Sequence, residues 1–352
     1  MTAIPVAIEW HPGLSIYASE PFLRAVGDQY GWIGGIDDSG TLRCVLPYSV
    51  VRKNVLHMVR FRVQTIPLRG ELDVVDEKQF LNSAVEYLRS TGADIIIPAS
   101  TNTIFQAYPD GAMAAPYGTY IIDLGQPEEA LWANLSSSHR RKVRLAMKSG
   151  VKIIMGLDDV QMSYRLIRDT FRRSALPFMN YDRFERMVFS LGENVKVFIA
   201  EHYGAVQGCA VIPFSSHSAY YVYGGSIPEP VTGATNLLHW EAIRLFRDLR
   251  VKRYDLVGVR INPEKGSKQE GLMIFKERFG GQLVQGYIWK YAFRPLKYFL
   301  YRVATQVRTG GDIVDNEHHK LKASKASPAA LPISRGICDG LLRQQTQHHV
   351  EK

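Results

Sequence analysis

The chain has 352 residues, of which 46% are hydrophobic, and it carries a formal net charge of +9. That length accommodates two domains of ordinary size, each with its own hydrophobic core. No apolar run of roughly eighteen residues occurs, and the N-terminus lacks a basic segment followed by an apolar one. We therefore expect neither a membrane-spanning helix nor a signal peptide, and we expect a cytoplasmic protein.

The cysteines and histidines follow no metal-binding or disulfide pattern. Cys44, Cys209 and Cys338 are far apart and form no C-x-x-C motif. The histidine pairs at 318–319 and 348–349 lie in polar sequence without a thiolate or carboxylate pattern beside them. We expect no metal and no other cofactor. The excess of basic residues instead favours a polyanionic partner, such as tRNA, a nucleotide diphosphate or an anionic membrane surface.

The first part of the chain alternates short extended runs with turns. Residues 30–36 and 41–51 are predicted to pair as a hairpin across a turn at 37–40. A strand is predicted at residues 94–97. A helix before it is predicted from the spacing of Phe80, Ala84, Tyr87 and Leu88. Strands separated by helices indicate an α/β or α+β domain, which we place at residues 1–127.

A second domain is predicted at residues 128–308. Serines at 136–138 supply a cap for a helix that ends at Gly150. The elements predicted after it are a strand (151–155), helices (160–174 and 182–190), a hairpin (195–201 with 206–214), a helix (236–249) and a strand (253–257). The apolar stripe of the last helix comprises Leu238, Ala242, Leu245 and Leu249. From residue 309 to 352 the sequence is polar, and we expect a disordered tail with at most a short helix near 337–342.

Three segments of the second domain resemble the FemABX family. Residues 271–281, with Phe275-Lys276 at their centre, follow the strand at 254–258 and resemble the family's C-terminal signature. Residues 220–226 resemble its tyrosine-rich strand, and residues 238–244 resemble its "leucine-x-Trp-Glu-Ala-Ile" helix. The resemblance runs from about Leu131 to Tyr298.

The resemblance implies an α/β (α+β) fold of two tandem GNAT-like acyltransferase domains. No long heptad insertion is present, so the coiled-coil arm of some family members is expected to be absent. One position departs from the family pattern. The family's strand ends in a pair of glycines, whereas Val257 precedes Gly258 here.

The function implied by the resemblance is aminoacyl transfer. An aminoacyl group would move from aminoacyl-tRNA to an amine of a peptidoglycan or cell-surface polysaccharide precursor, either UDP-linked or lipid-linked. Two alternatives stay open: a CoA-dependent GNAT N-acyltransferase of surface-polysaccharide biosynthesis, and a non-catalytic protein that binds tRNA or a nucleotide. The turn at 230–235 has one glycine and no leading cation, which disfavours CoA.

The candidate catalytic residues are Lys276, Phe275 and Asp255. A lysine flanked by apolar residues could hold a positive charge beside a reacting carbonyl, where water is excluded. Asp255 could accept a proton from an attacking amine, although its place in an apolar strand also suits a structural role.

The candidate substrate-binding residues are mostly cations. They are Arg140, Arg141, Arg144 and Lys148 on the first helix of the second domain, Arg260, Lys265 and Lys268 in the loop after the 253–257 strand, and Tyr223. Arginines and lysines four residues apart share a helix face and repel each other, which suggests an anionic partner. A solvated basic face is the alternative. Val143 and Met147 are predicted to form the apolar side of the same helix.

Aromatic and basic residues at 287–302 raise a further possibility, contact with the inner membrane face. Leu296, Phe299, Leu300 and Val303 form a helical stripe that would more simply pack on the protein, with Lys297 and Arg302 facing outward.

Overall fold

The computed structural model describes residues 1–157 and 160–326. The strands are β1 (Thr2–Val6), β2 (Gln29–Ile36), β3 (Leu42–Lys53), β4 (Leu56–Phe61), β5 (Ile66–Pro67), β6 (Ile95–Ile96), β7 (Met113–Asp123), β8 (Val151–Met155), β9 (Val195–His202), β10 (Ala205–Pro213), β11 (Ala219–Tyr220), β12 (Tyr223–Ser226), β13 (Arg253–Val259) and β14 (Gln282–Ala292). The α-helices are α1 (Glu20–Val26), α2 (Val74–Ser90), α3 (Glu128–Asn134), α4 (Ser137–Lys148), α5 (Val160–Arg173), α6 (Tyr181–Ser190), α7 (Ala234–Asp248), α8 (Lys268–Glu277), α9 (Pro295–Thr309) and α10 (Ile313–Ala326).

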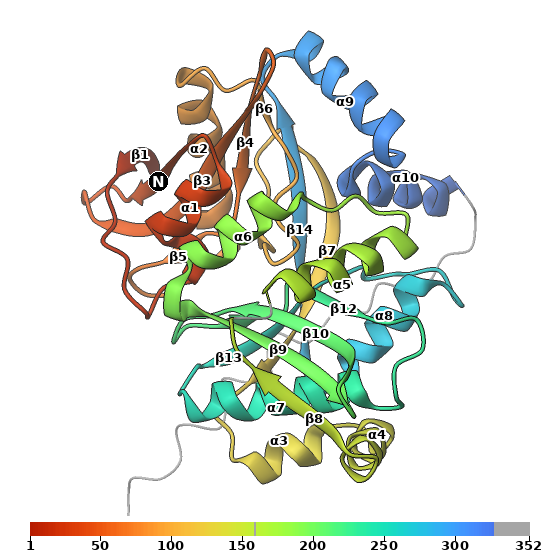
Figure 1. Cartoon of the computed structure of the whole chain (residues 1–352). Coiled ribbons are helices and arrows are strands. Elements are labelled where there is room, and N and C mark those ends of the chain that lie inside the picture. The colour runs from red at the N-terminus through yellow and green to blue at the C-terminus, as the bar shows by residue number, and fades with distance from the viewer. Residues whose placement is uncertain (158–159, 327–352) are drawn as a thin grey trace, which may run out of the picture. The chain divides into compact units, whose positions relative to one another are not determined.

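A ten-stranded mixed sheet forms the centre of the unit Met1–His318 (Figure 1). Its strand order is β1-β2-β3-β4-β6-β14-β7-β13-β11, with β5 paired to β3. Strand β14 comes late in the chain yet lies between β6 and β7, which both precede residue 127. The sheet therefore continues across the boundary expected at residue 127, and residues 1–318 form one compact unit.

The second sheet has four strands in the order β12-β10-β9-β8. Alternate residues of β9 face opposite sides, as the period of a strand requires. Phe198 and Ala200 belong to the same apolar cluster as the buried face of α7. Val197 and Ile199 belong to a different cluster, with the buried residues of α5 and α6. Helices therefore cover both faces of this sheet, with α5 and α6 opposite α7 (Figure 1).

Local capping signals fix the ends of α4. The Ser136 hydroxyl accepts a hydrogen bond from the backbone N–H of His139, at 3.2 Å, and satisfies one of the unpaired amides of the first turn. Gly150 follows the helix with a φ of 82°, a conformation that glycine adopts without strain. The predicted start and end of this helix are confirmed.

The sequence suggested that the tyrosine-rich segment, residues 220–226, forms a single strand. The structure instead divides this segment between two sheets. Tyr220 pairs with Asp255 in the large sheet, whereas Tyr223 pairs with Val211 in the small one. The chain leaves one sheet and enters the other within three residues. Both runs have high strand propensity, and propensity does not specify which neighbour a strand will find.

Four further expectations need correction. Met147 and Leu249 are 50% and 46% exposed instead of lying on buried stripes, because Ala146 and Phe246 take the inward positions. The apolar stripe of α9 is exposed instead of packed, with Leu296 at 84%. Helix α10 occupies residues 313–326 of the segment expected to be disordered. The helix suggested near 337–342, Cys338 and the histidines at 348–349 lie outside the described residues.

Candidate acyl-transfer site

A β-bulge in β13 organises the residues around Asp255. The register between β13 and β7 shifts between Asp255 and Gly258, so an extra residue is accommodated there. Val257 takes a φ of 51°, a left-handed conformation that is a genuine outlier for a β-branched residue. This is the position at which the family pattern has glycine, and the conformation explains why glycine suits it.

Lys276 lies near the C-terminal end of α8 and is buried, with 8% exposure. Its Nζ donates hydrogen bonds to the carbonyl oxygens of Val257, at 2.7 Å, and Gly258, at 2.8 Å. Both acceptors belong to the bulge, which turns them toward α8. Burial disfavours the ammonium form and lowers the pKa of Lys276 to about 8.

Asp255 holds the other side of the same bulge. One carboxylate oxygen accepts hydrogen bonds from the Thr119 hydroxyl, at 2.5 Å, and from the Val257 N–H, at 2.7 Å. Burial raises the pKa of Asp255, while these two hydrogen bonds and the charge of Lys276 oppose the shift. Val257 thus joins the two charged groups, bonding Asp255 through its N–H and Lys276 through its carbonyl. This arrangement favours the structural interpretation of Asp255.

Phe275 packs in an aromatic cluster with two histidines that sequence reasoning missed. The ring centroids of His139 and His239 lie 5.3 and 5.7 Å from that of Phe275, and Phe279 lies at 5.1 Å. His139 Nε2 lies 3.2 Å from the Phe275 carbonyl oxygen, and His239 Nδ1 lies 3.0 Å from the Tyr254 hydroxyl. Burial lowers the pKa of His239 to about 3 and that of His139 to about 4. Both rings are therefore neutral at physiological pH.

The four candidate cations of α4 have different environments. Arg140 donates to the backbone carbonyl oxygens of Ala133, at 2.7 Å, and Leu135, so it caps the C-terminal end of α3. The Arg144 guanidinium lies over the Trp132 ring, at 5.3 Å from its centroid. Arg141 and Lys148 are exposed, and neither forms an ion pair with another described residue.

The cations of the loop after β13 are only partly available to a ligand. The Arg260 side chain forms an ion pair with Glu317 at 2.8 Å, and both groups are largely buried. Lys268 donates to the hydroxyl of Ser174. Lys265 is exposed. The partner of Arg260 could not be anticipated, because Glu317 falls in the segment expected to be disordered.

The positive charges of three arginines, which the sequence analysis did not select as candidates, act on the hydroxyl of Tyr223. Burial raises the pKa of its hydroxyl, and the positive charges of Arg62, Arg60 and Arg183 oppose the rise. Arg62 is 6% exposed, and burial together with the charge of Arg60 lowers its pKa well below the usual value. Arg60 lies in β4, and Arg62 follows the last residue of that strand.

The hydrogen bonds of these arginines all go to neutral groups. Arg62 donates to Ser49 Oγ at 2.8 Å and to the Val26 carbonyl oxygen at 2.9 Å, and Arg183 reaches the same carbonyl at 3.4 Å. Arg60 donates to the Pro98 carbonyl oxygen at 3.0 Å. Within the described part of the chain, none of the three forms an ion pair with a carboxylate. A guanidinium has five N–H donors, so each retains donors for an anionic ligand.

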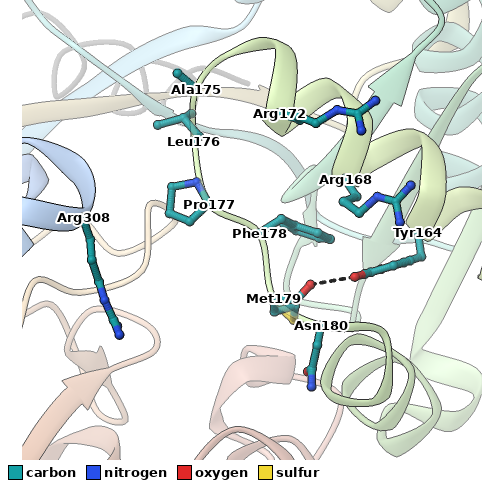
Figure 2. A pocket seen from close by; sticks show the side chains of 10 residues that line it. All are labelled: Tyr164, Arg168, Arg172, Ala175, Leu176, Pro177, Phe178, Met179, Asn180 and Arg308. Carbon is teal, nitrogen blue, oxygen red and sulfur yellow. Dashed lines mark hydrogen bonds between the residues drawn. The ribbon is translucent and has the colours of Figure 1, made fainter.

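A separate cavity of about 470 Å³ lies between the loop after α5 and the end of α9 (Figure 2). The Tyr164 hydroxyl donates to the Met179 carbonyl oxygen there, at 3.0 Å. Its lining residues are Tyr164, Arg168, Arg172, Ala175, Leu176, Pro177, Phe178, Met179, Asn180 and Arg308. None of the candidate site residues lines this cavity, so it is distinct from the Lys276 site.

Neither a metal cluster nor a membrane-spanning helix occurs among residues 1–157 and 160–326. No group of three or more His, Cys, Asp or Glu side chains there could hold a metal ion. No helix in the same residues is long and apolar enough to cross a bilayer.

The fold resembles that of several solved structures. A crystal structure of FemX matches with a TM-score of 0.59 and 15% identity, covering 82% of this chain and 93% of that one. The C-terminal domain of a putative lysylphosphatidylglycerol synthetase from Agrobacterium fabrum matches with a TM-score of 0.51 and 13% identity, covering 83% and 93%. The expected mixed α/β fold class is thereby confirmed.

The family resemblance is also confirmed by sequence. The profile of the FemAB family matches residues 105–203. These residues include the basic helix α4 but end before the Phe275-Lys276 segment, on which the expected resemblance had been centred. No significant match was found among curated protein sequences.

Proposed function

We propose that this protein transfers an aminoacyl group from aminoacyl-tRNA to an amine of a peptidoglycan or cell-surface precursor in the cytoplasm. FemX-like architecture and the FemAB match support acyl transfer as the class of reaction. The observation that carries the proposal is the buried ammonium of Lys276. Two of its three N–H groups are bonded to the bulge carbonyls, which leaves one donor for a reacting group.

In the proposed reaction, the acceptor amine attacks the carbonyl carbon of the aminoacyl ester. A carbon–nitrogen bond forms, the carbon–oxygen bond of the ester breaks, and the ribose hydroxyl leaves with the proton that the amine gives up. Negative charge develops on the carbonyl oxygen before the ester bond breaks. The remaining N–H of Lys276 stabilises that charge in surroundings from which water is largely excluded.

The arginine cluster Arg60, Arg62 and Arg183 is our candidate for holding the acceptor. A phosphate or carboxylate accepts bidentate hydrogen bonds from guanidinium groups and would relieve their mutual repulsion. The charges of the same three arginines act on Tyr223, which supports its expected role in substrate binding. The exposed Arg141 and Lys148 of α4, and Lys265 of the loop after β13, are the cations free to contact tRNA phosphates.

The packing of the turn at 230–235 disfavours the CoA alternative. The Val231 N–H donates to Gln207 Oε1 at 3.0 Å, and the Ala234 N–H donates to the Val231 carbonyl oxygen at 2.9 Å. Gly233 lies so close to α4 that an added Cβ would come within 2.1 Å of the Lys142 carbonyl oxygen. Backbone amides that are bonded internally and packed against a helix are poorly placed to receive a diphosphate.

The test of the proposed function is mass spectrometry. Purified protein is incubated with aminoacyl-tRNA and UDP-linked or lipid-linked precursors, and muropeptides and surface glycans are compared between cells with and without the protein. We expect the mass of one aminoacyl group to be added to a precursor in vitro and to be missing from cells that lack the protein. If no acyl product appears with any precursor, the proposal is wrong.

Substitution of Lys276 tests its role directly. Lys276→Met should reduce turnover by about a hundredfold to a thousandfold, the usual effect of losing one oxyanion donor. Turnover of the native protein should also fall as the pH rises through about 8, because the ammonium loses its proton there. Lys252→Met, at an exposed lysine, is the matched control.

A second variant separates catalysis from structure at this position. Met leaves two carbonyls without a donor, whereas Lys276→Gln retains N–H groups without the charge. We expect Lys276→Gln to fold with nearly native thermal stability and to be as inactive as Lys276→Met. Native turnover in either folded variant would show that the lysine is structural.

A further inference from the structure

Helix α9 presents a continuous apolar stripe to solvent. Leu296, Phe299, Leu300, Val303 and Val307 recur at spacings of three, one, three and four residues, so they share one face of the helix. Leu296 and Val307, at the two ends of the stripe, are 84% and 82% exposed. A contiguous exposed apolar stripe of this kind marks an interaction surface.

The opposite side of α9 is anchored to the protein, which fixes the direction of the stripe. The Tyr301 hydroxyl donates to Asp312 Oδ2 at 3.1 Å, and Lys290 Nζ lies 5.4 Å from the centroid of the Tyr298 ring. Lys290 is itself held by Asp312 and Asp315 at 2.9 and 2.6 Å. Rotating the helix to bury the stripe would break these contacts, so the apolar side faces outward.

Basic residues lie on both sides of the stripe. Helix α9 contains no acidic residue, and Lys297 and Arg308 follow one edge of the stripe while Arg302 follows the other. The tip of the β3–β4 hairpin adjoins the start of the helix, because Lys297 Nζ donates to the Val55 carbonyl oxygen at 2.8 Å. That tip adds the exposed Arg52 and Lys53, and Val55 is 63% exposed.

We propose that α9 and the tip of the β3–β4 hairpin dock on an anionic lipid surface. A helix that has an apolar face bordered by cations and is too short and polar to span a bilayer lies in the membrane interface. Its apolar side chains enter the boundary between headgroups and acyl chains. Its arginines, together with Arg52 and Lys53 of the hairpin tip, contact anionic headgroups, whereas Lys297 is held by Asp94 at 2.9 Å.

Charge argues against a second copy of this chain as the occupant. In a symmetric dimer the same face of each copy forms the interface, so the cations beside one stripe would approach the cations beside the other. Like charges brought together at an interface disfavour association. An anionic bilayer supplies the opposite charge on both sides of the stripe.

The test is co-sedimentation of the full-length protein with vesicles. We expect binding to vesicles of phosphatidylcholine and phosphatidylglycerol in equal parts, weaker binding to phosphatidylcholine alone, and release by salt. The double variant Leu296→Gln/Val307→Gln should reduce binding at least about tenfold, since two apolar side chains no longer enter the interface. Val75 and Met155, 64% and 51% exposed, provide the matched control as Val75→Gln/Met155→Gln, which should bind like the native protein.

A second pair of variants tests the charges. Arg302→Gln/Arg308→Gln should weaken binding to the anionic vesicles about twenty-fivefold, roughly fivefold for each charge removed. Lys152→Gln/Lys252→Gln removes two exposed lysines elsewhere and should have little effect. All of these positions are exposed, so circular dichroism should show native folding.

Three outcomes would overturn the proposal. One is a native protein that does not bind the anionic vesicles at low salt, and another is an apolar double variant that binds as the native protein does. The third is a native dimer that the apolar variant converts to a monomer without any vesicle binding. None of the substitutions touches Lys276 or the arginine cluster, so acyl transfer can be measured independently.

Discussion

At the scale of single residues, Val257 shows how the site tolerates an unfavourable backbone. A left-handed conformation costs an L-residue about 1–2 kcal/mol, and a β-branched side chain adds crowding. The Asp255 carboxylate and the Lys276 ammonium bond the N–H and the carbonyl of this residue. Hydrogen bonds from these two side chains to one residue stabilise a backbone conformation that the branched side chain of Val257 disfavours.

This interpretation predicts an inverted order of stability at residue 257. Alanine is usually more stable than glycine within a strand, by about 0.5–1 kcal/mol. At Val257, where φ is 51°, we expect Val257→Gly to be more stable than Val257→Ala, by about 1 kcal/mol, because only glycine relieves the strain. Urea denaturation measures the difference.

Val259 on the same strand is the matched control for that experiment. It is buried, with 4% exposure, and it is not among the residues with positive φ. The usual order, with Val259→Ala more stable than Val259→Gly, is expected there. If Val257 shows the same order as Val259, the left-handed conformation does not strain the protein.

The buried charge of Lys276 was predictable, whereas the arginine cluster was not. An apolar neighbourhood in the sequence is enough to suggest a sheltered lysine, and Lys276 is sheltered. Arg183 lies far along the chain from Arg60 and Arg62, and each of the three looks like an ordinary surface arginine in the sequence. Their proximity is a property of the fold.

At the scale of secondary-structure elements, the cations of α4 divide into one that bonds the neighbouring helix and others that are exposed. Arg140 satisfies carbonyls at the end of α3, so Arg140→Gln should lower the free energy of unfolding by about 1–2 kcal/mol. Arg141 and Lys148 are exposed, and Arg141→Gln or Lys148→Gln should change stability by less than about 0.5 kcal/mol.

The effects on tRNA binding should be the reverse of those on stability. Arg141→Gln and Lys148→Gln should weaken binding more than Arg140→Gln does. Removing Arg141 or Lys148 should reduce the slope of log affinity against log salt by about 0.7–0.9 for each phosphate that the protein no longer neutralises. Filter binding across a salt series measures that slope, and thermal melts measure stability. An Arg140→Gln protein as stable as the native one would contradict the structural role, and unchanged salt slopes would contradict the proposed binding of tRNA phosphates.

Elements defined by local signals were predicted well, and those defined by distant partners were not. The α4 helix has its cap and its terminal glycine within its own sequence, and both are confirmed. The stripe of α9 predicts an amphipathic helix, but periodicity does not reveal what covers the apolar face. The same limit applies to residues 220–226, where strand propensity alone could not indicate the change of sheet.

At the scale of the whole molecule, β14 determines how independent the two expected domains can be. It pairs with β7 from Gln282 opposite Ile121 to Lys290 opposite Met113, and it pairs with β6 through Tyr291 and Ala292. Trp289 of this strand is 2% exposed and packs 5.4 Å from the ring centroids of both Phe61 and Phe105. The core of the first part of the chain therefore includes a residue supplied by the second.

Residues 1–127 expressed alone should consequently fail to fold. Without β13 and β14 the strand β7 has no neighbour, one edge of β6 and both edges of β7 are left unpaired, and the space filled by Trp289 becomes a cavity in the core. We expect the fragment to show no cooperative thermal transition and no near-ultraviolet circular dichroism, whereas the fragment 1–318, the whole compact unit, should melt cooperatively. Co-expression with residues 128–352 should restore folding, because it returns β14 to the gap. A cooperative transition in the isolated 1–127 fragment would show instead that the first domain is autonomous and that β14 only joins a sheet already formed.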